Sequence, residues 1–359
     1  MNGRFVKGLE LSKLFYEEAV RPILKQEFPR LLYSVGLMGK GSEVLGFDTP
    51  QSTDHDWGPR LLLFLSDKDF PACRNDVDLV LRRELPHEFC GYPTNFSTSR
   101  KGVDTTPAEE SSSDHSVVIF TIGGFVHSVL GFDVRGVMSA TDWVRVPSQL
   151  LLSLTAGDVF HDGLGQLEAV REGLRYYPRP VWLYLLAAQW RRIGQEEAFM
   201  GRCGQVGDDL GSALIAARLI RDLMRLCFLM ERRYAPYNKW LGTAFTRLGC
   251  ADHLCPLFAR VFQARSWQER EAGLTPAYEF VARMHNDLAI TDPIHAVVSP
   301  YYERPFLVIH ADRFVNAIRA RIDDEDVLAL PAHLGSVDQF VDSTDALNCF
   351  DHMRCLYEY

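Results

Sequence analysis

Hydrophobic residues recur at two spacings along this chain, and the change of spacing divides the sequence into two parts. Between residues 8 and 30, apolar positions follow a 3.6-residue period with charged residues between them, which predicts a helix. Two strands are predicted, at 31–37 and 54–65. The first is a short apolar run, and the second is entered from a loop and ends in the continuous apolar run 61–65, which is typical of a buried strand. After about residue 140, long amphipathic stretches predominate, so the sequence predicts a small α/β part followed by a mostly helical part.

The first part carries further patterned segments. Residues 70–84 predict a helix that covers the sheet. Two β-rich runs, 117–122 and 125–132, are separated by a Gly-Gly pair, which predicts a hairpin. Between them and the helix, residues 91–115 are rich in serine, threonine and glycine and lack periodicity, which predicts a long loop.

The second part consists of helical stretches, the first two separated by Pro178 and Pro180. The predicted helices span 164–176, 180–195, 211–234, 239–248, 254–264, 267–288 and 306–320. We therefore predict an α+β protein, with a mixed-sheet domain over residues 1–145 and a mostly α-helical domain over residues 146–359.

Composition and charge argue against two classes of binding partner, nucleic acids and membranes. The chain of 359 residues has a formal net charge of −9, which argues against an extended nucleic-acid groove and makes a nucleic-acid partner unlikely. No apolar run approaches the roughly 20 residues that span a bilayer, and the N-terminus lacks the features of a signal peptide. We expect no membrane association and a cytoplasmic location, while the sequence leaves the oligomeric state open.

The candidate chemistry lies near the first two predicted strands. Gly41 and Ser42 follow the first strand, and Asp54 and Asp56 stand at the start of the second. Acids two residues apart on a strand point to the same side, and their repulsion favours a bound cation such as Mg²⁺. Backbone N–H groups in a Gly-Ser turn suit a phosphate. Together they predict a metal–nucleotide site, for which phosphoryl or nucleotidyl transfer is the usual chemistry.

The order helix, strand, Gly-Ser, loop, Asp-x-Asp resembles the polymerase-β-like nucleotidyltransferase superfamily. Gly41-Ser42 is similar to its Gly-Ser element, and Asp54 and Asp56 to its first two metal-binding carboxylates. The resemblance implies two Mg²⁺ ions, a nucleoside triphosphate (NTP), and transfer of a nucleoside monophosphate to an acceptor. Residues 182–248 resemble the helical bundle that follows the catalytic domain in small-molecule nucleotidyltransferases.

Within this superfamily the chain looks most similar to an uncharacterised bacterial branch, a domain of unknown function. The segments that carry this resemblance are 54–58 (DHDWG), 156–162 (AGDVFHD), 176–178 (YYP) and 234–240 (YAPYNKW). The resemblance covers most of residues 10–250.

The superfamily adds a third carboxylate from a neighbouring strand, but the run at 117–122 contains no acid. Asp114 precedes that run and Asp133 ends the next one, so we take Asp114 as the candidate and keep Asp133 as the alternative. A third acid would act as a general base or complete the coordination of the inner metal.

Two lysines are candidates for phosphate contacts. Lys40 stands beside the Gly-Ser turn and could add positive charge. Lys239 lies between Tyr237 and Trp240 at the start of a predicted helix, where it could reach an NTP phosphate or be an ordinary solvated lysine. In the second part, Asp162 stands just before the predicted helix 164–176, which favours a capping role over that of an acceptor-site acid that attracts a cationic substrate.

These observations favour a Mg²⁺-dependent nucleotidyltransferase that uses an NTP and a small-molecule acceptor. One alternative is a protein-modifying enzyme that transfers AMP. Another is a nucleotide-binding regulatory protein with a degraded site, which the acid-free strand supports. Addition of nucleotides to nucleic-acid ends is the least favoured, because the chain is acidic.

Overall fold

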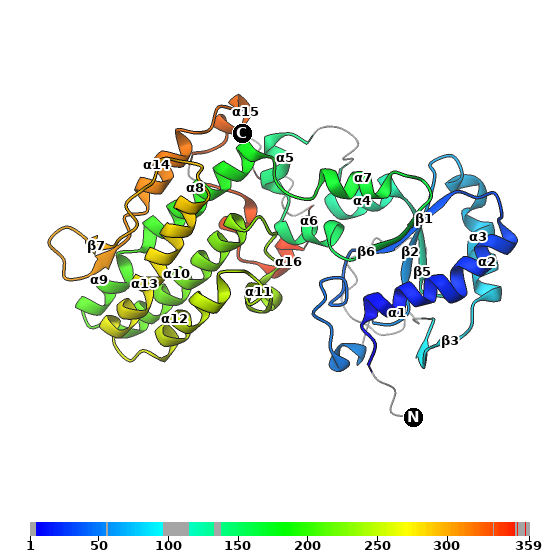
Figure 1. Ribbon diagram of the computed structural model, residues 1–359, viewed down its shortest axis with the longest axis horizontal. Coiled ribbons are helices and arrows are strands. Elements are labelled where there is room, and N and C mark those ends of the chain that lie inside the picture. The colour runs from blue at the N-terminus through cyan, green and yellow to red at the C-terminus, as the bar shows by residue number, and fades with distance from the viewer. Residues whose placement is uncertain are drawn as a thin grey trace. The chain divides into compact units, whose positions relative to one another are not determined.

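The computed structural model has an α+β fold, as the sequence predicts, in two compact units (Figure 1). Unit 1 comprises Met1–Val137 and Leu150–Arg175, and unit 2 comprises Met138–Gln149 and Tyr176–Tyr359. The structure describes residues 5–54, 57–95, 115–132, 138–332, 334–348, 350 and 356.

Unit 1 is built on a four-stranded mixed sheet in the order β5-β2-β1-β6. Strand β1 pairs antiparallel with both β2 and β6, whereas β2 and β5 run parallel. Its elements are α1 (Gly8–Phe15), π-helix η1 (Tyr16–Val20), α2 (Arg21–Glu27), β1 (Tyr33–Leu37), 3₁₀-helix η2 (Pro50–Asp54), β2 (Leu61–Leu65), α3 (Phe70–Glu84), β3 (Glu88–Phe89), β4 (Tyr92–Pro93), β5 (Val117–Thr121), α4 (Ile122–Leu130), β6 (Asp158–Asp162) and α7 (Leu167–Gly173).

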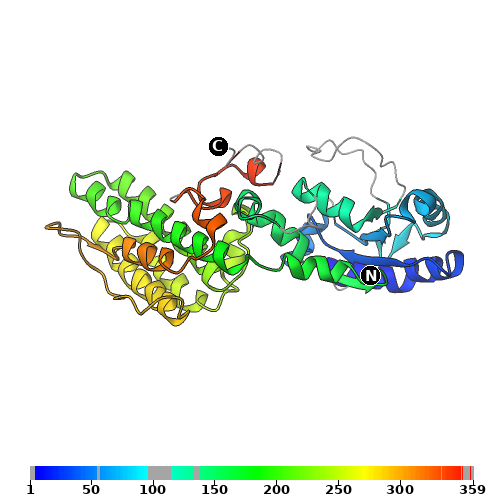
Figure 2. The ribbon, with the colours of Figure 1, turned by 90° about the horizontal axis from the view of Figure 1, so that it is seen from above.

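Strand β2 is buried on both faces, which explains its unbroken apolar sequence Leu-Leu-Leu-Phe-Leu. Leu61, Leu63 and Leu65 belong to one core cluster with side chains of α1, η1, α2, α3 and β5. On the other face, Phe64 packs edge-on against Phe125 of α4, with ring centroids 5.6 Å apart. Figure 2 shows the rod of α1 and α2 on one side of the sheet and α4 on the other.

Several predictions for unit 1 are confirmed. Helix α3 has the predicted bounds, β1 lies inside the predicted strand 31–37, and the predicted helix 8–30 corresponds to α1, η1 and α2. The hairpin prediction is wrong, because residues 122–130 form helix α4. The hydroxyl of Thr121 accepts a hydrogen bond from Gly124 N at 3.0 Å, so the Gly-Gly pair belongs to a capped first helical turn.

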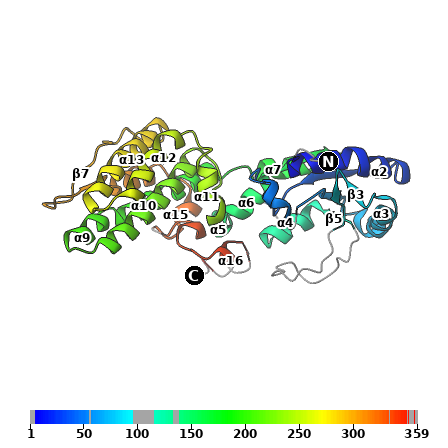
Figure 3. The same cartoon turned by 90° about the horizontal axis from the view of Figure 1, so that it is seen from below.

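Unit 2 is mostly helical. Helix α8 packs on α10 and α14, α10 packs on α9 and α13, and α13 packs on α12 (Figures 1 and 3). None of the described helices is long and apolar enough to cross a membrane. Helix α6 (Ser148–Thr155) is divided between the two units. The elements of unit 2 are α5 (Ala140–Arg145), α8 (Arg179–Glu196), α9 (Phe199–Gln205), α10 (Asp209–Met230), α11 (Asn238–Phe245), α12 (Ala251–Gln263), α13 (Trp267–Asp287), β7 (Ser299–Pro300), β8 (Leu307–Val308), α14 (Asp312–Arg319), α15 (Glu325–Leu328), 3₁₀-helix η3 (Val337–Gln339) and α16 (Thr344–Leu347).

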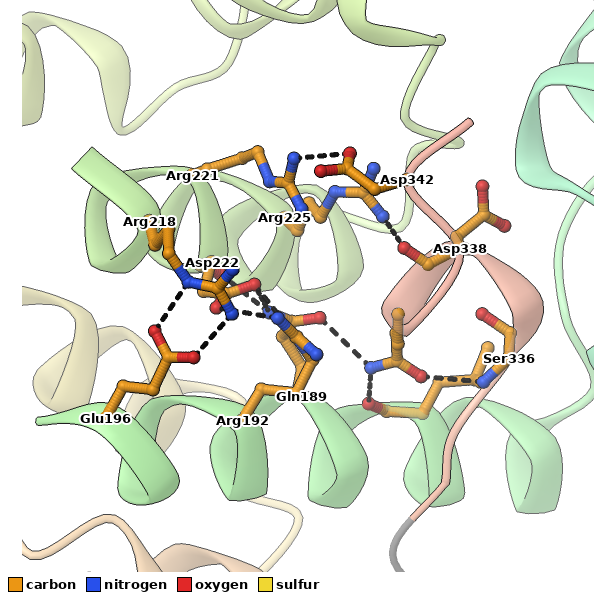
Figure 4. A network of polar contacts seen from close by, with 12 residues as sticks. Gln189, Arg192, Glu196, Arg218, Arg221, Asp222, Arg225, Ser336, Asp338 and Asp342 are labelled. Atoms are coloured by element: carbon orange, nitrogen blue, oxygen red, sulfur yellow. Dashed lines mark hydrogen bonds and ion pairs between the residues drawn. The ribbon is translucent and has the colours of Figure 1, made fainter. Parts of the chain in front are cut away.

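A network of polar side chains joins α8, α10 and the segment around η3 (Figure 4). Gln189 Nε2 donates to a carboxylate oxygen of Asp222 at 3.1 Å, and Arg192 Nε donates to the same carboxylate at 3.1 Å. From the C-terminal side, the buried Gln339 donates to the carbonyl of Leu185 and to Gln189 Oε1, each at 3.0 Å. Because Gln189, Asp222 and Gln339 are buried, each of these side chains depends on its hydrogen-bond partners.

We predict that Gln339→Ala lowers the free energy of unfolding by about 1–3 kcal/mol, because it leaves buried donors and acceptors unpaired. The backbone N–H of Ser336 loses its acceptor as well, since it donates to Gln339 Oε1 at 2.8 Å. Urea denaturation measures the change. The matched control is Asp342→Ala, which removes a largely exposed carboxylate paired with Arg221 and is expected to cost less than about 1 kcal/mol. Equal losses of unfolding free energy in the two variants would contradict the stabilising role of the buried Gln339 hydrogen bonds.

Glu197 joins the end of α8 to the loop that precedes α14. Its carboxylate, only 8% exposed, accepts hydrogen bonds from the backbone N–H groups of Ile309, His310 and Ala311 at 2.9, 2.9 and 3.1 Å. Burial raises the pKa of Glu197 to about 7, and the three N–H donors only partly oppose this shift.

This shift predicts a pH-dependent stability. A carboxyl group whose pKa is raised on folding stabilises the protein fully below pH 4.5, its value in the unfolded chain, and the contribution disappears as pH rises to about 7. The stability advantage of the native protein over Glu197→Gln should therefore shrink across this window by about 3 kcal/mol. Denaturant unfolding at several pH values tests this, and a pH-independent difference would show that folding does not raise the pKa of Glu197.

Candidate functional site

The end of β1 and the start of β2 lie at the same edge of the sheet. The two strands run antiparallel, and Gly36 of β1 is opposite Leu62 of β2. The turn that follows β1 and the chain that leads into β2 therefore meet at this edge, as a composite phosphate and metal site requires.

The turn after β1 contains three glycines in left-handed or related conformations. Gly39, Gly41 and Gly46 have φ values of +96°, +136° and +68°, which side chains with a Cβ rarely adopt. Gly39 N donates to Ser153 O at 2.8 Å, and Phe47 N donates to Ser42 O at 2.8 Å. These hydrogen bonds fix both ends of the turn.

An ion pair fills the inside of the turn. Arg60, just before β2, donates through Nε to Glu43 Oε1 at 2.8 Å, and its terminal nitrogen contacts both Glu43 and the carbonyl of Lys40. Glu43 is 1% exposed. A Cβ on Gly41 would lie 2.6 Å from both carboxylate oxygens of Glu43, so only glycine fits beside this pair.

A second buried carboxylate holds the chain between the turn and η2. Asp48 Oδ2 accepts from Gly8 N at 2.8 Å and from Trp57 Nε1 at 3.2 Å, while Lys7 Nζ lies 3.3 Å from Oδ1. Asp48 is 1% exposed. This carboxylate thus connects the start of α1 to the segments on either side of η2.

The turn keeps hydrogen-bonding groups available for an anion. Within the described residues, no hydrogen bond engages the backbone N–H of Gly41, the N–H of Ser42 or the Ser42 hydroxyl. Both residues are partly exposed, and Lys40 beside them is exposed. Such a turn can receive phosphate oxygens through successive N–H donors.

Of the acids predicted for the site, the structure describes the backbone of Asp54 only. Asp54 ends the 3₁₀-helix η2, and strand β2 begins only at Leu61, so the prediction of a strand from residue 54 is wrong. Asp56 and Asp114 lie outside the described residues, as does Asp133, so their roles stay predictions. Within the described residues, no group of three metal-ligating side chains forms a metal site.

The remaining candidates lie elsewhere in the fold. Lys239 belongs to unit 2, where it is exposed in the first turn of α11, with Nζ 5.2 Å from the ring centroid of Trp240. Asp162 lies in β6 and accepts hydrogen bonds from the N–H groups of Leu167 and Glu168 at 3.4 and 3.2 Å. Asp162 therefore caps the first turn of α7, as predicted, although Gln166 and not Asp162 is the residue at the N-cap position.

Sequence reasoning missed Glu43, Asp48 and Arg60. Glu43 and Asp48 are acids within a short stretch that also carries apolar residues, and Arg60 directly precedes an all-apolar strand. Charges in such positions are a signal of burial with a partner. Because the partners are distant in sequence, the pattern alone could not identify them.

One comparison with known proteins gives a match. The family model described as "Domain of unknown function (DUF4037)" matches residues 143–241, which include α8, α10 and the first half of α11. No curated protein and no solved structure matches the chain. The similarity to a domain of unknown function therefore concerns a segment that lies mostly in unit 2.

We predict that Gly41→Ala destabilises the protein by about 1–4 kcal/mol, because the new Cβ meets the Arg60–Glu43 pair and the backbone has a positive φ. Thermal and urea unfolding measure this effect. The matched control is Gly173→Ala at the end of α7, where a Cβ would have no neighbour within 4 Å and no destabilisation is expected. A Gly41→Ala protein as stable as the control would mean that the turn does not need glycine.

Proposed function

We propose that unit 1 binds the triphosphate of an NTP with Mg²⁺, and that the protein is a nucleotidyltransferase that passes the nucleoside monophosphate to a small-molecule acceptor. The observation that best supports this proposal is the contact of Arg60 with the carbonyl of Lys40 and with Glu43. This contact joins the chain that follows Asp54 to the Gly-Ser turn. It supports a common site for the acids and the phosphate donors.

The residues of this edge suit both ligands. The N–H groups of Gly41 and Ser42 and the Ser42 hydroxyl are donors for β- and γ-phosphate oxygens, and Lys40 adds positive charge. Asp54 and Asp56 offer the carboxylate oxygens that Mg²⁺ prefers. When bound, Mg²⁺ would neutralise charge that develops on the phosphates. The resemblance to polymerase-β-like nucleotidyltransferases, noted from the sequence, supports the same assignment.

A second candidate function is a nucleotide-binding regulatory protein without turnover. The observation in its favour is the sequence of β5, Val-Val-Ile-Phe-Thr, which carries no acid although it is the direct neighbour of β2. If Asp114 does not supply the missing carboxylate, nucleotide would bind without transfer. Transfer of AMP to a protein acceptor uses the same site and differs only in which molecule carries the product.

The four NTPs should be tested with Mg²⁺ for a rise in melting temperature and for pyrophosphate release. We expect Asp54→Asn and Asp56→Asn each to reduce pyrophosphate release by at least about 100-fold, since each removes a metal ligand. Ser42→Ala should weaken NTP binding about tenfold through loss of one donor to a charged group.

Asp76→Asn is the control, because Asp76 is an exposed acid on α3 of the same unit and should leave both measurements unchanged. Binding without pyrophosphate release would favour the regulatory protein. Turnover that survives Asp54→Asn and Asp56→Asn would contradict the assigned site.

A further inference from the structure

A cavity of about 320 Å³ lies at the other end of β1, beside Tyr33 rather than beside Gly41. We call it the aromatic cavity and define it by Tyr16, Arg21, Lys25, Tyr33, Phe160 and His161, which all line it. Its residues come from η1, α2, β1 and β6 of unit 1. No residue of the proposed nucleotide site lines it.

A strand irregularity shapes one wall of the aromatic cavity. In the β1–β6 ladder, Val35 is opposite His161 and Gly36 is opposite Val159, so Phe160 is an extra residue. Neighbouring residues of a regular strand point to opposite faces, whereas Phe160 and His161 both line the cavity. Bulges of this kind often redirect side chains toward functional sites.

A helix irregularity shapes another part of the lining. The helical rod changes from α-helix to π-helix over Tyr16–Val20, and Tyr16 is the first residue of that turn. Single π-helical turns occur frequently at functional sites. The ring of Tyr16 lies nearly parallel to that of His161, at 21° with centroids 6.3 Å apart, and the centroid of Tyr33 is 5.0 Å from that of His161.

The polar groups of the cavity indicate what it could recognise. The hydroxyls of Tyr16 and Tyr33 are 3.5 Å apart, a weak mutual contact that leaves both able to bond a ligand atom. Arg21 and Lys25 stand four residues apart on the same helix, where two like charges repel each other. Neither makes an ion pair within the described residues, and Glu17 is the single acid that lines the cavity.

We propose that the aromatic cavity binds a planar aromatic molecule that carries an anionic group. The ring would pack against Tyr33 and His161, which are partly exposed and exposed, and the anionic group would lie between Arg21 and Lys25. A nucleoside monophosphate and an aromatic carboxylate share this chemistry. The proposal does not depend on the nucleotidyltransferase assignment, because the two sites have no residue in common.

Isothermal titration calorimetry without Mg²⁺ tests the proposal on the full-length protein. AMP and 4-hydroxybenzoate are the two ring-bearing anions, adenosine and phenol are their uncharged counterparts, and inorganic phosphate and acetate are anions without a ring. We expect at least one ring-bearing anion to bind, its uncharged counterpart to bind at least tenfold more weakly, and the ringless anions not to bind. Binding of AMP alone would assign a nucleotide, and binding of 4-hydroxybenzoate alone a carboxylate.

Variants then locate the binding. The double variant Arg21→Ser/Lys25→Ser should weaken binding at least fivefold, and His161→Ala should weaken it as well; both change exposed side chains. Lys68→Ser removes an exposed cation of unit 1 outside the cavity and should leave binding unchanged, as should Ser42→Ala in the proposed nucleotide site.

Three results would overturn the proposal. The first is that neither ring-bearing anion binds, and the second is that uncharged rings bind equally well. The third is binding that Ser42→Ala abolishes while the cavity variants retain it, because the ligand would then occupy the Gly-Ser turn.

Discussion

The ion pair between Arg60 and Glu43 is the interaction on which the proposed site depends. Glu43 is nearly inaccessible to solvent, and a buried carboxylate without its partner would cost about 3–5 kcal/mol. The pair joins two segments, the turn after β1 and the chain just before β2. It also explains Gly41, because the guanidinium and the carboxylate occupy the space of a side chain.

The sequence predicted those elements whose pattern is local. Helix α3 repeats its apolar side at helical spacing, and the five buried residues of β2 form one apolar run, so periodicity and length identify both. The Gly-Gly pair at 123–124 led to the wrong prediction of a hairpin, since a hairpin turn and the capped first turn of a helix both accept glycine. The cap from Thr121 decides for the helix, and sequence pattern alone does not weigh that hydrogen bond against a strand pairing.

Features of the site that depend on distant contacts escaped the sequence. Glu43 with Arg60, and Asp48 with Gly8 and Trp57, are pairs whose members are far enough apart that no spacing rule applies. Strand β6 was likewise hidden, because its mixed residues become a strand only through pairing with β1. The Gly-Ser turn was found because the glycine requirement is local, whereas the geometry of the acids depends on the chain entering β2.

The most direct test is a crystal structure of the protein with Mn²⁺ and a nonhydrolysable NTP analogue. The account predicts an anomalous metal peak at coordination distance from the carboxylates of Asp54 and Asp56, with the triphosphate on the N–H groups of Gly41 and Ser42. A triphosphate bound away from this turn, or a turn that remains empty while the analogue is saturating, would contradict it.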